Sequence, residues 1–165
     1  MPLALQIIVR FIVLVPIQIL VLDNIQFMGY INPMIYPLFV LTLPIRFPRW
    51  ISLLLGFAVG LTIDVFSNSL GIHTFATVFL AFIRNPIISL YVAFDDNANP
   101  SPTFRVFGAG NYVKYIVTTV FLHHLVLFAA ESFSLVSFGF VLPKIILSSV
   151  VSITLILLIQ SFNSK

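Results

Sequence analysis

Two adjacent histidines and a downstream glutamate, His123, His124 and Glu131, are the most unusual polar group in the sequence. His124 and Glu131 are seven residues apart and face the same way on a helix. Such side chains could relay protons, bind an ion, contact a partner protein or hydrogen-bond between helices. A shared metal ion is disfavoured, because adjacent helical histidines diverge by about 100° and the spacing matches no metalloprotease pattern. Interhelical hydrogen bonding, partner contact, and ion or proton chemistry stay open.

A second group, in the middle of the chain, contains Asp64, His73 and Arg84. A carboxylate within a membrane helix is costly unless it is paired, capping or near the interface. Asp64 is therefore expected to close a turn by bonding backbone or Asn68, or to contact a partner or ion. His73 and Arg84, eleven residues or about three helical turns apart, should share a face at opposite membrane ends. Because Asn85-Pro86 follows it, Arg84 is predicted to anchor a cytoplasmic helix end, with residues 87–94 along the interface.

Small residues recur every four positions ahead of Asp64, at Ser52, Gly56 and Gly60. Such a stripe lets helix backbones approach closely in a membrane. One interpretation is packing against another span of the same chain. The other is a lipid-exposed docking surface for a partner protein.

These side chains belong to a chain with little other polar chemistry. Of 165 residues, 60% are hydrophobic and 8% are charged, whereas soluble domains carry about 25% charged residues. No polar stretch is long enough for a soluble catalytic, nucleotide-binding or nucleic-acid-binding domain. The chain contains no cysteine, which excludes disulfides and thiolate metal sites. The composition predicts a polytopic membrane protein.

We predict an all-α membrane fold, a single integral domain over residues 1–165 with about six transmembrane helices. The second span is expected to start at Pro33 with Asn32 as its cap, and to be short, tilted or re-entrant. Residues 95–112 are expected to form the one sizeable loop, on the cytoplasmic side. The expected spans are 3–22, 33–45, 50–66, 72–91, 113–131 and 143–160.

The cations predict the orientation, because short cytoplasmic loops carry an excess of Lys and Arg. With six crossings and a cytoplasmic amino terminus, only Lys144 lies outside, and both termini are cytoplasmic. The cations then on the cytoplasmic side are Arg10, Arg46, Arg49, Arg84, Arg105, Lys114 and Lys165.

Residues 56–84, GFAVGLTIDVFSNSLGIHTFATVFLAFIR, resemble the MreD family, small integral membrane subunits of the bacterial rod-shape machinery. Chain length and span number are similar too, as are the paired histidines with a downstream acid. The residues that carry the resemblance in a span-turn-span arrangement are Gly60, Asp64, Phe66, Gly71, His73, Ala76 and Arg84.

The resemblance implies a non-enzymatic scaffold in the bacterial inner membrane, without cofactor or metal. The partners it implies are an MreC-like protein, a RodA-type glycosyltransferase, a class B penicillin-binding transpeptidase, the MreB filament and membrane lipids, with no nucleic acid. Association with a second copy of the chain stays open. The residues expected at packing or partner interfaces are Ser52, Gly56, Gly60, Asp64, Gly71, His73, Arg84, His123, His124 and Glu131.

The family's fold is similar to the substrate-binding subunits of energy-coupling-factor vitamin transporters, which supplies an alternative function. A transporter subunit would need an outward-open pocket with convergent polar groups. The candidates near the outer side are Asp64, His73, His124 and Glu131.

Overall fold

The computed structural model describes residues 2–25, 31–93, 100–132 and 138–163, which are mostly helical. The described residues confirm the predicted all-α class, and five of the helices are long and apolar enough to cross a membrane, which fits a membrane protein. They are α1 (Leu3–Ile17) with its π-helical continuation η1 (Gln18–Leu22), α3 (Arg49–Ser67), α4 (Ile72–Tyr91), α6 (Ala109–Ser132) and α7 (Phe138–Asn163). Two short helices, α2 (Pro37–Leu41) and α5 (Phe104–Phe107), complete the described elements.

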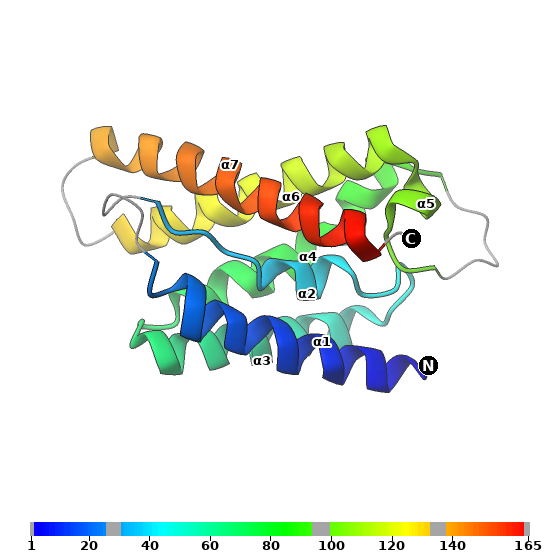
Figure 1. Cartoon of the computed structure of the whole chain (residues 1–165), viewed down its shortest axis with the longest axis horizontal. Helices are drawn as coiled ribbons and strands as arrows, with labels where there is room; N and C mark the ends of the chain where they lie inside the picture. Colours follow the sequence, from blue (N-terminus) through cyan, green and yellow to red (C-terminus); the bar gives the residue numbers. More distant parts are fainter. Residues whose placement is uncertain (1, 26–30, 94–99, 133–137, 164–165) are drawn as a thin grey trace.

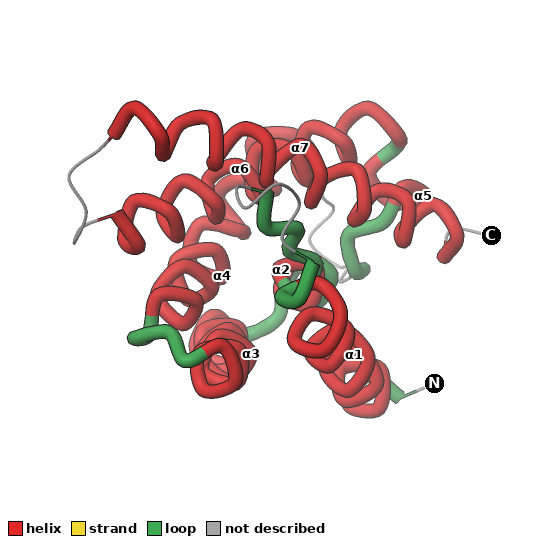
Figure 2. The backbone as a smooth tube through the Cα atoms, turned by 60° about the vertical axis from the view of Figure 1, so that its left-hand side comes forward, coloured by secondary structure: helices red, strands yellow, loops and turns green. Residues whose placement is uncertain are grey.

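The long helices lie roughly along one axis and surround α2 (Figures 1 and 2). α3 packs on α4, α4 on α6, and α6 on α7, whereas α1 packs more lightly against α2 and α3. α1 and α3 begin, and α4 ends, at one end of the bundle, here called the basic end (Figure 1). At the other end, the acidic end, α3 turns into α4. Among the described residues, Arg46, Arg49, Arg105 and Lys114 belong to the basic end, and Asp23, Asp64 and Glu131 to the acidic end.

Residues 31–45, here called the central segment, lead from the acidic end to the basic end through the middle of the bundle (Figure 1). The expectation of a helix starting at Pro33 is wrong, because only Pro37–Leu41 is helical. Pro37 takes the first helical position, where its missing N–H costs nothing. The segment therefore contains a single short helix between non-helical stretches.

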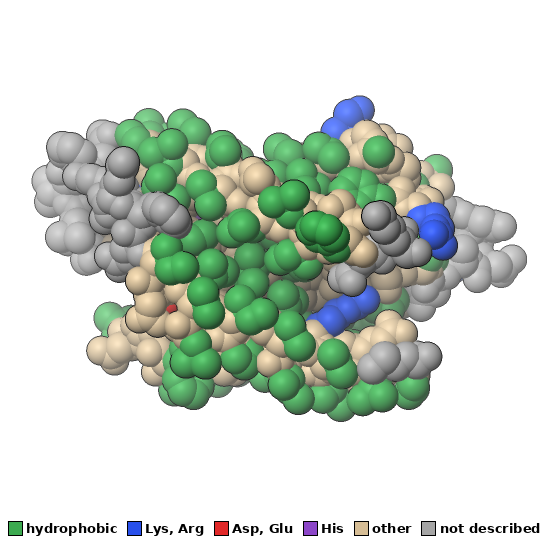
Figure 3. All heavy atoms as spheres, in the orientation of Figure 1, with side chains coloured by type: hydrophobic (Ala, Val, Ile, Leu, Met, Phe, Trp, Pro, Cys, Tyr) green, Lys and Arg blue, Asp and Glu red, His purple; other side chains and the backbone are tan. Residues whose placement is uncertain are grey.

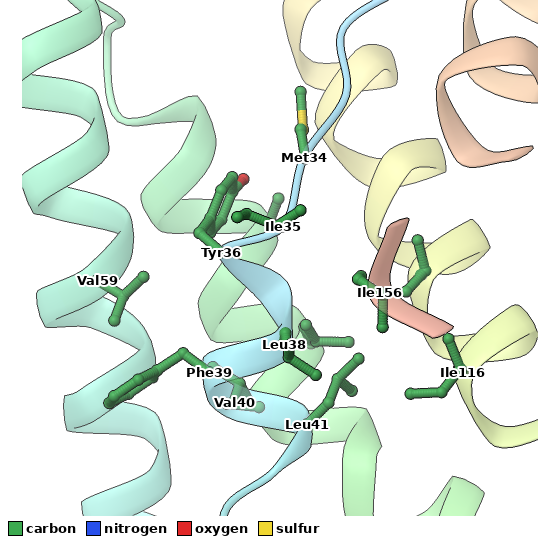
Figure 4. Close-up of a cluster of buried hydrophobic side chains, with 14 of the residues drawn as sticks. Met34, Ile35, Tyr36, Leu38, Phe39, Val40, Leu41, Val59, Ile116 and Ile156 are labelled. Carbon is green, nitrogen blue, oxygen red and sulfur yellow. The ribbon is translucent and has the colours of Figure 1, made fainter. Parts of the chain in front are cut away.

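The α2 side chains form the centre of the apolar core. Leu38, Phe39, Val40 and Leu41 are each at most 3% exposed. Figure 4 shows them between α3 on one side and α6 and α7 on the other. Full burial of such a side chain stabilises the fold by roughly 1.5–3 kcal/mol, so burial holds in place a helix too short to be stable alone.

The small-residue stripe lies inside the α3–α4 contact. Ser52 is 3% exposed, and Gly56 and Gly60 are buried. A Cβ added to Gly60 would lie 2.4 Å from the Cα atom of Thr74, and one at Gly56 would lie 3.1 Å from the carbonyl oxygen of Thr77. The expectation of a lipid-exposed docking surface is therefore wrong: the stripe lets two spans of the same chain approach closely.

Two predicted boundaries also change. α6 begins at Ala109, within the predicted loop 95–112, because Thr103 caps α5 and Gly108 leads directly into the next helix. Part of that loop, residues 95–99, lies outside the described residues. α7 begins at Phe138, ahead of the span expected from residue 143, and contains Pro143.

Candidate functional site

Asp64 closes the turn between α3 and α4 at the acidic end. Its carboxylate accepts hydrogen bonds from the backbone N–H groups of His73 (3.1 Å) and Thr74 (2.8 Å), and from the hydroxyls of Ser69 and Thr74. Those N–H groups belong to the first turn of α4, where helical donors have no partner within the helix. Gly71 precedes this turn with a φ of 84°, a conformation that favours glycine. Asp64 is thus 4% exposed and directed into its own turn.

Asn68 takes part in the same turn through its backbone rather than its side chain. Its φ of 52° places it in the left-handed region, and its N–H donates to the main-chain carbonyl of Asp64. The expected bond to Asn68 therefore exists, but at the Asp64 backbone. The Ser69 N–H donates to the same carbonyl at 3.0 Å, so the ending combines the bond of the αL motif with the 6→1 bond of the Schellman motif.

At the acidic half of the central segment, two α7 serines bind its backbone N–H groups. Asn32 N donates to Ser148 Oγ at 3.1 Å, and Met34 N donates to Ser152 Oγ at 2.8 Å. A non-helical backbone cannot satisfy these groups itself, and an unpaired buried N–H is costly. The serines supply the missing acceptors.

Gln18 serves the same half of the segment from η1. Its Oε1 accepts from the N–H of Ile35 at 2.8 Å, and its Nε2 donates to the carbonyl of Pro33 at 3.1 Å. Nε2 also donates to Asp23 Oδ1 at 2.7 Å. The amide therefore pairs with alternate backbone groups as a neighbouring strand would.

The basic half of the segment presents carbonyl groups, because a helix leaves its last four carbonyls unpaired. The Tyr115 hydroxyl donates to the Leu41 carbonyl at 3.1 Å. The Arg10 guanidinium donates to the Thr42 carbonyl at 2.9 Å. These two donors come from α6 and α1.

Arg84 supplies the remaining donors, and the prediction that it anchors a cytoplasmic helix end is wrong. Its side chain is fully buried and donates to the carbonyls of Leu43 and Pro44. α4 continues through Asn85-Pro86 to Tyr91. Ile87 and Ile88 are 6% and 2% exposed, so their burial keeps this stretch helical against the core instead of along an interface.

His124 completes a fully paired chain of hydrogen bonds. Its Nδ1–H donates to the Val120 carbonyl at 2.9 Å, which leaves Nε2 as an acceptor. Ser152 Oγ lies 3.1 Å from Nε2 and also accepts the Met34 N–H, so its own proton points to the imidazole. Both ring nitrogens are therefore used in holding α6, α7 and the central segment together.

His123 turns the other way, toward Tyr36. The Tyr36 hydroxyl lies 3.1 Å from His123 Nε2 and 2.9 Å from His73 Nδ1. The Tyr36 hydroxyl has one proton and can donate to only one of the two rings, so the His123 Nε2–H donates to Tyr36 and the Tyr36 hydroxyl donates to His73 Nδ1. This arrangement leaves the buried His123 Nδ1 as an unpaired acceptor. The reverse arrangement would leave an unpaired N–H donor there, which is rarer in proteins. His73 then carries its own proton on Nε2.

His73 also lines a cavity of about 390 Å³ at the acidic end. Several polar groups of this end line the cavity. Its polar lining comes from Asp23, Asn24, Asn32, Ser67, Ser69, His73 and Glu131. Of the four residues predicted to line an outward pocket, His73 and Glu131 line this cavity. Asp64 instead bonds to the turn between α3 and α4, and His124 bonds to Val120 and Ser152.

Glu131 pairs with Lys144 at 2.8 Å, and both side chains are partly exposed. The ammonium also lies 4.7 Å from the centre of the Phe128 ring. The three residues of the predicted cluster therefore point to different partners, His123 to Tyr36, His124 to Ser152 and Glu131 to Lys144. Among the described residues, no three potential metal ligands of the His, Asp or Glu type come together.

Sequence reasoning missed most of the partners of these groups. Gln18, Tyr36, Ser148 and Ser152 belong to no motif in the sequence. The available signal was the set of prolines in the central segment, since a broken backbone inside a membrane must receive hydrogen bonds from other spans.

Comparisons with protein families, with curated proteins and with solved structures found no match to this chain.

Proposed function

We propose that the chain is a non-enzymatic scaffold of the bacterial rod-shape machinery, coupling an MreC-like protein and peptidoglycan synthases to the MreB cytoskeleton. The observation that carries this role is a lateral apolar cavity of about 350 Å³ between α1 and α3. Ile12, Leu20 and Phe66 line it and are 62%, 71% and 68% exposed. Such a hollow fits the apolar side chains of a partner's transmembrane helix, which packs in lipid by close contact.

The rigid interior also supports a scaffold. Asp64, His124 and Arg84 each make at least one hydrogen bond to the chain's own backbone. A bundle fixed in this way would hold periplasmic and cytoplasmic partners at a constant separation. The MreD resemblance of residues 56–84 supplies the identity of those partners.

We further propose six crossings in the inner membrane, with both termini in the cytoplasm. Non-helical backbone is tolerated at membrane depth where protein surrounds it, as it surrounds the central segment. The cations of the basic end favour the cytoplasm for that end. Cysteine labelling tests the topology: Leu70→Cys, at a turn residue 98% exposed, should label from outside and Ser101→Cys from the cytoplasm.

Site-specific photo-crosslinking in cells tests the scaffold role. A benzophenone amino acid in place of Ile12 should capture the MreC-like protein. The matched position is Val150 on α7, which is 57% exposed and lies outside this cavity. Depletion of the chain should also convert rods into spheres. Normal rods after depletion, or capture of no rod-shape component from either helix, would count against the scaffold.

The acidic-end cavity favours a second candidate, a small-molecule-binding subunit of a vitamin-type transporter. Its volume and its mixed polar lining suit a small ligand. The purified chain should then carry a small molecule or show saturable thermal stabilisation by one. His73→Phe should weaken that stabilisation, whereas Ile12→Ala on the other cavity should leave it unchanged.

A further inference from the structure

A second lateral opening lies between α1 and α7 at the basic end, with a volume of about 480 Å³. Its apolar lining comes mainly from α1, α2 and α7 and includes Val9, Val13, Leu38 and Ile159. Figure 3 shows this face, largely apolar and with a basic side chain between the two helices. The polar lining comes from Gln6, Arg10, Thr42, Thr103 and Gln160.

Arg10 has unused hydrogen-bonding capacity at this opening. A guanidinium carries five N–H donors, and one terminal nitrogen of Arg10 donates to the Thr42 carbonyl. Within the described part of the chain, no carboxylate pairs with it. A cation in an apolar setting favours an anion as its partner.

Gln160 is a second, independent polar group at the same opening. Its side chain is 7% exposed, lines the cavity and makes no hydrogen bond to the described residues. Its amide atoms are not among the fully buried side-chain atoms that lack a partner, so the amide reaches the open space of the cavity, where a ligand or water can pair with it. Gln160 on α7 and Arg10 on α1 thus offer donors to the same space.

The depth of Arg10 suits a lipid headgroup. It lies seven residues after Leu3, where α1 begins, which is about 10 Å along a helix. An arginine at this depth extends toward the membrane interface, where lipid phosphates lie. Val13, three residues further along α1, is 47% exposed on the path that an acyl chain would take, and Val9, the residue before Arg10, is 40% exposed.

We infer that the opening between α1 and α7 binds one anionic phospholipid, with the phosphate on Arg10 and Gln160 and an acyl chain against Val9, Val13 and Ile159. The apolar walls distinguish a lipid from a free phosphate ion. The site is separate from the α1–α3 cavity and from the acidic-end cavity. It therefore stands independently of either proposed function.

Native mass spectrometry of the delipidated full chain tests the site. Dioleoylphosphatidylglycerol should bind with one preferred equivalent. Dioleoylglycerol, which lacks the phosphate, and inorganic phosphate, which lacks the chains, should each bind at least about tenfold more weakly. Equal binding of dioleoylglycerol would overturn the phosphate contact, and equal binding of inorganic phosphate would overturn the lipid.

Two pairs of variants locate the site. Arg10→Gln keeps a donor for the Thr42 carbonyl and should weaken phosphatidylglycerol binding about tenfold, whereas the same change at Arg105, exposed on α5 at the same end, should not. Val13→Trp should block the acyl chain, whereas Ile8→Trp, on α1 but outside the opening, should not. Equal effects within both pairs would show non-specific lipid association and overturn the site.

Discussion

The α3–α4 pair and the central segment meet the same requirement, a backbone held away from water, in opposite ways. α3 and α4 satisfy their own backbone groups, so their contact can be built from small residues such as Gly56 and Gly60. The central segment cannot satisfy its own backbone groups, and these form hydrogen bonds with side chains from α1, η1, α4, α6 and α7. Continuous helices need close approach, whereas broken ones need polar side chains from their neighbours.

This difference explains the types of the polar side chains that contact the central segment. Serine and glutamine oxygens accept at the acidic half of the segment, where N–H groups are unpaired. Arginine and tyrosine donate at the basic half, where carbonyls are unpaired. Acceptor side chains thus lie where the central segment has free N–H groups, and donor side chains lie where it has free carbonyls, as at the two ends of a helix.

The largest effect is expected at the close approach of α3 and α4. Gly60→Leu should lower the free energy of unfolding by at least about 3 kcal/mol, because even its Cβ would overlap the Thr74 backbone. Equilibrium unfolding in mixed detergent micelles measures the change.

Gly110→Leu is the matched control for this change. A Cβ at Gly110, also helical, has no heavy atom within 4 Å. Its expected effect is therefore limited to the difference in helix propensity. Similar losses of unfolding free energy for the two variants would show that the effect of Gly60→Leu does not come from the α3–α4 contact.

The next largest effect tests the donors of the central segment. Arg84→Met removes the partners of the Leu43 and Pro44 carbonyls. Unpaired carbonyls cost about 1–3 kcal/mol each, partly offset because a buried charge is also removed. We expect a net loss of about 2 kcal/mol, measured by the same unfolding experiment. Arg49→Met, at an exposed position of α3, should change stability by less than about 0.5 kcal/mol.

The limits of sequence reasoning follow the same division. Apolar runs and charge spacing predicted the approximate positions of the five long helices, and the turn at Asn68–Gly71, because these depend on local composition. The partners of the central segment could not be predicted, since Asn32 pairs with Ser148 across 116 residues. Arg84 was placed wrongly because the local signal of Asn85-Pro86 is overridden by the burial of Ile88.

A smaller effect separates two serines on α7 that are both buried, Ser149 at 2% and Ser152 at 0% exposure. Ser152→Ala removes the acceptor of the Met34 N–H and the donor to His124, and should cost about 1 kcal/mol. Ser149→Ala removes a hydroxyl without a partner in the described chain and should be neutral or slightly stabilising. Equal losses at both positions would contradict the role given to Ser152.

The smallest effect is expected outside both regions, at the Glu131–Lys144 pair. Lys144 and Glu131 are 22% and 45% exposed, so water can replace either partner. Exposed ion pairs contribute about 0–1 kcal/mol, and a double-mutant cycle of Glu131→Gln and Lys144→Met should give a coupling energy within that range, decreasing with added salt. A coupling energy as large as the loss of stability expected for Arg84→Met would mean that the Glu131–Lys144 pair stabilises the fold as strongly as a buried group. Polar side chains that do not contact the central segment would then also be important for stability.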